Sequence, residues 1–205
     1  MTFKDFRKLV FQHIDQYSVA GEVIPASYNN QKDMIDRVCS LANVAMRTIC
    51  TQAYLLTAIL DPMASNVRKE EMPNGLTKIT MPTDFFKMTG QGIPTFNGDI
   101  AYARNLNYRF YAPDQIIVAT RDLNKIHIPY HRYPRQLHGR DDEILDGPET
   151  VADCASFYVA AELSRETSPY AYQSLYNEFE TMMARLKPTL ITELSEVEDV
   201  YGFFG

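Results

Sequence analysis

The residue types best suited to chemistry are concentrated in IHIPYHRYPRQL, residues 126–137, which His138 follows at once. Histidine is a common metal ligand and general base, so this stretch is the first candidate site. If it forms a strand, His127 and His131 point to one face but stand about 13 Å apart, four residues at ~3.3 Å each. A zinc ion needs each ligand nitrogen at about 2.1 Å, so one ion cannot bind both. The spacing predicts no metal site here.

The same stretch has the alternation expected of a strand. Apolar Ile126, Ile128 and Tyr130 alternate with the more polar residues between them. Pro129 has no backbone N–H to donate to a neighbouring strand, which predicts a strand at the edge of its sheet.

A second candidate is the acidic run Asp141-Asp142-Glu143. Together with a nearby histidine, these carboxylates could bind Mg²⁺ or Mn²⁺ in a small metal-dependent phage nuclease, and this stays as an alternative. Exposed acids at the start of a helix more often face solvent and interact with the helix dipole. The phosphate-binding, dinucleotide, zinc-protease and serine-hydrolase motifs do not occur in the chain. We therefore predict no catalytic residue, no metal, no cofactor and no enzymatic activity.

Composition narrows the class of protein. The chain has 205 residues, 45% hydrophobic and 22% charged, which is typical of a globular protein. Its net charge of −6 argues against a surface that binds nucleic acid over its whole extent. No apolar run reaches about 18 residues and the first residues lack a secretory pattern, so we predict synthesis in a cytoplasm and no membrane partner. Three cysteines are expected to be buried free thiols.

Hydrophobic periodicity predicts helices at both ends of the chain. Apolar residues recur at helical spacing over 2–17, with Thr2 as the cap, and over 30–61, where Asp61-Pro62 ends the pattern. Two more helices, 151–166 and 169–187, are expected to form a hairpin. The middle of the chain is instead rich in β-branched and aromatic residues.

The middle third is expected to contain a small antiparallel meander. Runs at 107–112, 115–120 and 125–133 are separated by turn residues, and 76–82 is a further strand. The stretch 83–106 is expected to be a long loop that becomes ordered on assembly, with three phenylalanines: Phe85, Phe86 and Phe96.

These elements predict a mainly α fold with a β insertion (α+β), a helical bundle carrying a small antiparallel β meander. Residues 1–62 and 149–190 would form the bundle, and 63–148 the β-rich insertion with its long loop. Residues 191–205 would form an acidic and aromatic C-terminal tail.

Two features favour binding to other macromolecules. Basic residues gather in and near the meander, which gives candidates for a subunit interface or a DNA-facing channel: Arg104, Arg109, Arg132, Arg135 and His131. The tail supplies candidates for docking to a partner: Val197, Tyr201, Phe203 and Phe204. The alternatives are that the basic residues are solvated strand faces, and that the tail packs back onto the helical hairpin.

The order of three short motifs resembles that of the head-to-tail adaptor proteins of tailed bacteriophages, including the tail tubular protein A group. Met81-Pro82-Thr83-Asp84-Phe85 resembles the Leu-Pro-x-Asp-Phe segment that opens the β insertion in that family. Tyr130 to Pro134 matches a Tyr-x-x-x-Pro strand end, and Tyr158 to Leu163 matches a Tyr-x-Ala-Ala-Glu-Leu helix. Methionine in place of the aliphatic residue at position 81 is a departure. The resemblance covers residues 30–187.

The resemblance implies a structural virion protein without catalysis. Such a protein forms a homo-oligomeric ring, usually a dodecamer, between the portal protein and the tail, nozzle or tail-tube proteins. Double-stranded DNA would pass through the ring without sequence-specific contacts. A soluble assembly or chaperone protein that never enters the particle is a further alternative.

Overall fold

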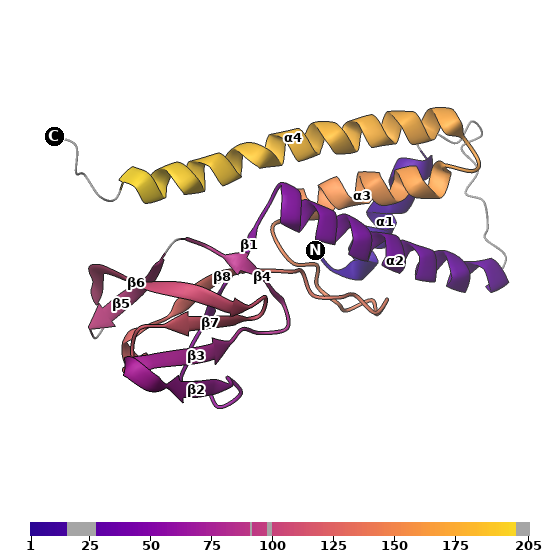
Figure 1. Cartoon of the computed structure of the whole chain (residues 1–205). Helices are drawn as coiled ribbons and strands as arrows, with labels where there is room; N and C mark the ends of the chain where they lie inside the picture. The colour runs from indigo at the N-terminus through magenta and orange to yellow at the C-terminus, as the bar shows by residue number, and fades with distance from the viewer. Residues whose placement is uncertain (16–27, 91, 98–99, 200–205) are drawn as a thin grey trace. The chain divides into compact units, whose positions relative to one another are not determined.

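The computed structural model describes residues 1–15, 28–90, 92–97 and 100–199, and side chains within 1–14, 36–90, 92–95 and 105–187 (Figure 1). The chain divides into two compact units. The helical unit comprises Met1–Leu55 and Pro134–Gly205, and the β unit is the insertion Leu56–Tyr133. The insertion thus begins and ends earlier than the predicted 63–148.

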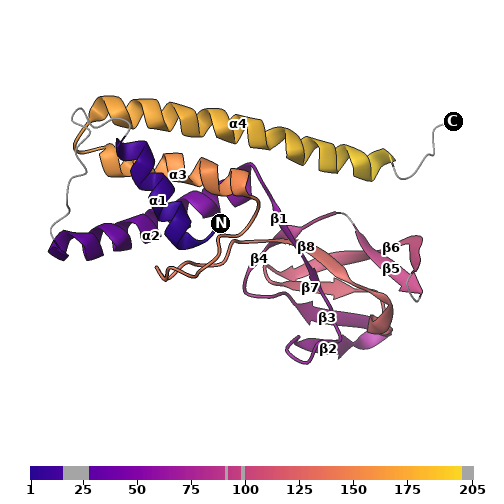
Figure 2. The ribbon, with the colours of Figure 1, turned by 180° about the vertical axis from the view of Figure 1, so that it is seen from behind.

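The helical unit is built around one central helix. It contains α1 (Phe3–Asp15), α2 (Tyr28–Gln52), α3 (Glu149–Ser164) and α4 (Pro169–Asp199). Both views show α3 running beside α4, and it also packs against α1 and α2 (Figures 1 and 2). Helix α3 suits this position because its buried residues are small and lie on several of its faces, among them Ala152, Ala155, Ser156, Ala160 and Ala161.

The first helix follows its sequence pattern. Phe3, Phe6 and Val10 are fully buried on one face of α1. The backbone N–H of Asp5 donates to Thr2 Oγ1 at 3.2 Å, which confirms the predicted N-terminal cap.

The β unit contains two antiparallel sheets. A three-stranded sheet has the order β1-β8-β4, and a five-stranded sheet the order β2-β3-β7-β6-β5. The strands are β1 (Leu56–Leu60), β2 (Lys69–Met72), β3 (Leu76–Thr80), β4 (Phe85–Met88), β5 (Gly92–Asn97), β6 (Ile100–Ala112), β7 (Gln115–Val118) and β8 (Ile128–Arg132). Both sheets contribute to one buried core that includes Leu60, Ile79, Ile93, Ile116 and Ile128.

The predicted fold class, a helical bundle with a small β meander, is wrong. The described residues form four helices and eight strands in a mixed α+β fold. The β unit is a separate compact unit with its own hydrophobic core.

The second predicted helix, 30–61, is too long. Helix α2 ends at Gln52, and Leu56–Leu60 forms β1. This strand pairs with β8 over its full length, from Leu56↔Arg132 to Leu60↔Ile128. Apolar residues in this short segment fit a helical period as well as a strand, and pairing with a distant strand decides between them.

The predicted loop at 83–106 is also wrong, because this stretch contains β4, β5 and the first half of β6. Its glycines suggested a loop, but Gly92 is required by the sheet. A Cβ atom added at Gly92 would lie 2.6 Å from the Cβ of Asn105 on β6, so only glycine permits this close approach. Ile93 beside it is fully buried.

Strand β8 is not part of the meander. It is also not an edge strand, although Pro129 had predicted one. It lies between β1 and β4 in the three-stranded sheet. The carbonyl of Pro129 accepts a hydrogen bond from Thr89 Oγ1 at 3.1 Å, so this part of the backbone faces the β4 side. The ladder between β4 and β8 ends at the pair Met88 and Tyr130. Pro129 lies just beyond this last pair, so its missing N–H removes no hydrogen bond from the ladder.

Helix α4 continues past Pro188 to Asp199 and does not end at Lys187 as predicted. An internal proline removes one helical hydrogen bond at a cost of about 3 kcal/mol. Good helix formers on both sides of Pro188, ARLK before it and the glutamates after it, favour continuation. Residues 191–199 of the predicted tail are therefore helical.

Candidate functional site

The β unit has an open groove that is a candidate for binding. Its volume is about 800 Å³, within the range of about 300–1,000 Å³ typical of ligand sites. Its lining mixes apolar, aromatic and polar residues with one exposed cation, among them Leu60, Met81, Phe85, Phe86, Tyr133 and Arg68.

One wall of this groove is the segment Met81–Phe86, which connects β3 to β4. Backbone bonds fix the segment, because Met81 N–H donates to the carbonyl of Asp114 at 2.8 Å and Phe85 N–H to that of Pro82 at 3.0 Å. This wall therefore has a defined shape before any partner binds.

Asp84 anchors the segment to β8 through both its backbone and its side chain. Its carbonyl accepts the N–H of Tyr133 at 2.7 Å, and its carboxylate accepts the hydroxyl of Tyr130 at 3.1 Å. Burial, reinforced by the negative charge of Asp84, raises the pKa of Tyr130 to about 12. The tyrosine therefore remains a neutral donor to Asp84 at physiological pH.

The aromatic wall continues out of the groove to the surface. The ring centroids of Phe86 and Tyr133 lie 5.1 Å apart, and Phe85 lies 6.4 Å from Phe110 on β6. Aromatic pairs at 4.5–7 Å attract one another beyond the effect of area burial. Phe110 is 54% exposed, so it extends the apolar surface beyond the groove.

Charge at the groove is mixed, with one available cation. Arg68 is exposed, and no ion pair joins it to the described part of the chain. Lys78 on the adjoining surface is already paired with Glu70. Asp114 is an acidic lining residue, in the turn between β6 and β7. A ligand carrying both aromatic groups and an anion would match Arg68 and its apolar surroundings.

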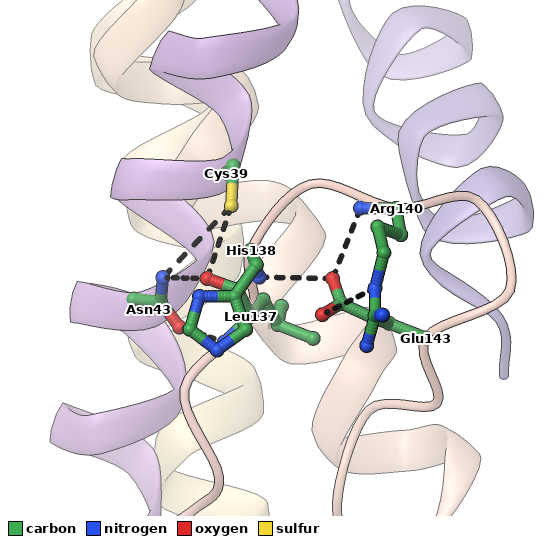
Figure 3. Close-up of polar contacts among 6 residues, drawn as sticks. All are labelled: Cys39, Asn43, Leu137, His138, Arg140 and Glu143. Atoms are coloured by element: carbon green, nitrogen blue, oxygen red, sulfur yellow. Dashed lines mark hydrogen bonds and ion pairs between the residues drawn. The ribbon is translucent and has the colours of Figure 1, made fainter.

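Two of the three acids proposed for a nuclease, Asp141 and Glu143, have structural roles in the helical unit, and Figure 3 shows the contacts of Glu143. Glu143 Oε2 accepts the N–H groups of His138 at 2.9 Å and Arg140 at 3.1 Å. Although burial alone would raise the pKa of Glu143, these N–H groups and the charge of Arg140 lower it. Asp141 forms an ion pair with Arg7 of α1 at 3.0 Å.

Helix α2 holds the preceding part of the same loop. Asn43 Nδ2 donates to the carbonyl of Leu137 at 3.0 Å, and its Oδ1 accepts the N–H of Leu137 at 2.8 Å (Figure 3). The thiol of Cys39 also points to that carbonyl, at 3.4 Å. Burial first, then the charges of Glu143 and Asp36, raise the pKa of Cys39, so its thiol stays protonated. All three cysteines are buried and free, which confirms the prediction made for them.

Within the described residues, no three histidine, cysteine or acidic side chains are grouped so that they could hold a metal ion. A histidine and a serine do meet between α1 and α3, which sequence reasoning missed. His13 Nε2 lies 3.1 Å from Ser156 Oγ, while that hydroxyl donates to the carbonyl of Asp153 at 2.6 Å. Ser156 is fully buried and its proton is already engaged, so this contact joins two helices and does not prepare a nucleophile.

The basic candidates are divided between the two units. Arg135 lies in the helical unit, where it makes an ion pair with buried Asp146 at 2.8 Å. In the β unit, Arg109 is exposed on β6 and Arg132 donates to the carbonyl of Tyr133 at 3.2 Å. His131 is only 8% exposed, and this burial removes it from the interface candidates.

The remaining candidates fall in different places. Phe85 and Phe86 line the groove and lie in strand β4, whereas a loop had been predicted there; their ordering on assembly stays a prediction. The side chains of Arg104, Phe96 and Val197 lie outside the described part of the structure, as do Tyr201, Phe203 and Phe204 altogether. Sequence reasoning missed Arg68, because only the folded β unit brings it beside the Met81–Phe86 segment.

Comparison with known proteins gives no family. No protein-family model matches the chain, and no curated protein matches it significantly. Across the described residues, none of the helices combines the length and the hydrophobicity needed to cross a membrane.

Proposed function

We propose that this chain is a structural protein of a tailed-bacteriophage particle, an adaptor that forms a ring between the portal protein and the tail. The observation that carries the proposal is the set of large apolar side chains left exposed on the β unit. Ile59 is 68% exposed, Tyr111 61% and Phe110 54%. Apolar side chains that remain exposed in this way are candidates for contact with other proteins.

The chemistry of the described residues supports binding in preference to catalysis. Glu143 accepts backbone N–H groups and Asp141 forms an ion pair with an arginine. The buried contact between serine and histidine joins two helices. The groove of the β unit instead offers aromatic and apolar side chains beside polar ones. This combination fits a protein whose function is to contact other proteins.

The order of the sequence motifs supports the choice of partners. The Met81–Phe85 motif forms a wall of the groove, the Tyr130–Pro134 motif ends β8, and the Tyr158–Leu163 motif lies in the central helix α3. In the proposed ring, the chain would contact the portal protein on one side and the tail, nozzle or tail-tube proteins on the other. A closed ring requires head-to-tail contacts between different surfaces of the same chain. Double-stranded DNA would pass through it without sequence readout.

The test is assembly on the portal protein of the same phage. The purified proteins are mixed and imaged by electron microscopy, and a ring of this chain seated on the portal is expected. Mass spectrometry of purified virions should find the chain at ring stoichiometry. Absence from virions would favour a non-virion assembly protein, and persistent failure to decorate the portal would refute the adaptor.

A pair of matched variants tests the exposed apolar surface. Ile59→Ser changes an isoleucine of the β unit that is 68% exposed, whereas Ile144→Ser changes one of the helical unit that is 62% exposed. We expect Ile59→Ser to reduce ring formation on the portal at least several-fold, because it removes apolar area from an interface. Ile144→Ser should have a much smaller effect, and both should leave the melting temperature nearly unchanged. Equal effects of the two variants on assembly would contradict a special role for the β unit.

A further inference from the structure

We infer that the groove of the β unit binds the acidic and aromatic segment 193–204 of a second copy of the chain. This inference rests on the proposed ring, and it names the contact between neighbouring subunits. The groove provides aromatic walls from Phe85, Phe86 and Tyr133 and an exposed cation, Arg68.

The composition of the segment complements this surface. Within twelve residues it has four acids and three aromatic residues: Glu193, Glu196, Glu198, Asp199, Tyr201, Phe203 and Phe204. Aromatic side chains bury about 150–250 Å² each and prefer edge or offset contacts with other rings. A carboxylate beside these aromatic residues could pair with Arg68, because a guanidinium offers a carboxylate two parallel N–H donors.

The other charged groups near the groove set the orientation. Asp114 lines the groove in the β6–β7 turn and disfavours an anion there. Lys69 and Lys78 lie on the adjoining surface that Arg68 shares, although Lys78 is paired with Glu70. The acids of the segment should therefore enter on the Arg68 side, with its aromatic residues against Phe85 and Phe86.

The length of α4 favours a contact of the segment outside the helical unit, and the proposed ring favours a second copy as the partner. Helix α4 has 31 residues and α3 has 16. At 1.5 Å per residue, α4 is longer than its antiparallel partner by roughly 22 Å. Both views show α4 continuing beyond the end of α3 (Figures 1 and 2). Residues 193–199, the helical part of the segment, therefore lie beyond the end of α3. Insertion into the groove of another copy joins two different surfaces, the type of contact that closes into a ring.

A peptide titration tests the chemistry of the contact. The probe is a fluorescent peptide of residues 193–204, and the target is the full chain carrying Phe203→Ser and Phe204→Ser, which leaves its groove available. We expect saturable binding by fluorescence anisotropy. Adding Arg68→Glu to the target should weaken binding roughly tenfold, because attraction becomes repulsion.

The matched control is Arg121→Glu, which reverses an exposed arginine of the β unit that does not line the groove. It should change the affinity less than twofold. A peptide in which both phenylalanines are serine should not bind. Lack of saturable binding, or equal weakening by Arg68→Glu and Arg121→Glu, would overturn the inference.

Sedimentation decides whether the segment binds a second copy. Wild-type chain, at concentrations well above the peptide dissociation constant, should form species larger than a dimer. The Arg68→Glu chain keeps its segment, and the Phe203→Ser/Phe204→Ser chain keeps its groove. The Phe203→Ser/Phe204→Ser chain alone should be monomeric, and the Arg68→Glu chain alone should associate roughly tenfold more weakly than wild type. An equimolar mixture should form mainly a heterodimer, which has one contact. A wild-type chain that stays monomeric although the peptide binds would show that the segment returns to its own groove, which overturns the inference.

The portal experiment separates this inference from the proposed function. If the chain forms a ring on the portal but does not bind the peptide, the adaptor proposal stands and the inferred contact is refuted. A chain that binds the peptide and self-associates but never decorates the portal retains the contact and loses the adaptor function.

Discussion

At the scale of single residues, Glu143 shows how an acidic run can serve structure. Its carboxylate accepts two backbone N–H groups of its own loop and lies 3.6 Å from the guanidinium of Arg140. Gly139 completes this turn with φ +88°, a conformation that side chains other than glycine rarely adopt. The sequence shows three adjacent acids, but which of them accepts a backbone N–H depends on a turn that only the folded loop defines.

The role of Glu143 predicts a pH-dependent stability. Its pKa is lowered in the folded chain from the usual 4.5. Its hydrogen bonds therefore stabilise the fold fully above that pH, and their contribution is lost as the pH falls through the lowered folded value. We expect Glu143→Gln to unfold at lower urea concentration than wild type at pH 7, and the two midpoints to converge below pH 4.5.

The control for this titration is Asp142→Asn, which alters the exposed acid next to Glu143. It should leave the urea midpoint close to that of wild type throughout the pH series. A difference between wild type and Glu143→Gln that is constant from pH 7 to pH 3 would contradict the role assigned to the carboxylate.

At the scale of elements, Asn43 connects helix α2 to the irregular loop before α3. It satisfies both the N–H and the carbonyl of Leu137, whose side chain is buried. Leaving buried polar groups without partners costs about 1–3 kcal/mol. We expect Asn43→Ala to lower the free energy of unfolding by about that amount, measured by urea denaturation.

Ser40→Ala is the matched control, because Ser40 is exposed one turn earlier on the same helix. Its effect should stay within about 0.5 kcal/mol. If both variants lower the free energy of unfolding by the same small amount, the contact between Asn43 and Leu137 does not stabilise the loop.

The elements also show where sequence reasoning succeeds and where it fails. Helices α1 and α3 and the start of α4 follow from periodic apolar residues, because a helix hydrogen-bonds within itself. The segment 56–60 was predicted to be helical because its partner β8 is distant in the chain, with Leu60 paired to Ile128. Strands β4 and β5 and the central position of β8 could not be predicted for the same reason, because they too depend on pairing with other strands. Of the candidate groove, Phe85 and Phe86 were identified from sequence, whereas Arg68 and Tyr133 join them only through folding.

At the scale of the whole molecule, the β unit is a self-contained insertion. The chain enters it at Leu56 and leaves it after Tyr133. Leu56 and Arg132 are paired neighbours on β1 and β8, so the two ends of the insertion lie side by side. An inserted unit with adjacent ends and its own core can fold without the rest of the chain.

This organisation predicts that residues 56–133 fold alone. The isolated fragment should give a cooperative thermal transition and a dispersed proton NMR spectrum, since its core residues, among them Ile79, Ile116 and Ile128, all lie within it. A core variant, Ile116→Ala, should lower its stability by about 2–5 kcal/mol, as expected for a fully buried isoleucine. The exposed Ile59→Ser variant serves as the control and should change stability little. A fragment without a cooperative transition would show that the β unit depends on the helical unit for folding, and assembly would then have to be tested only in the full chain.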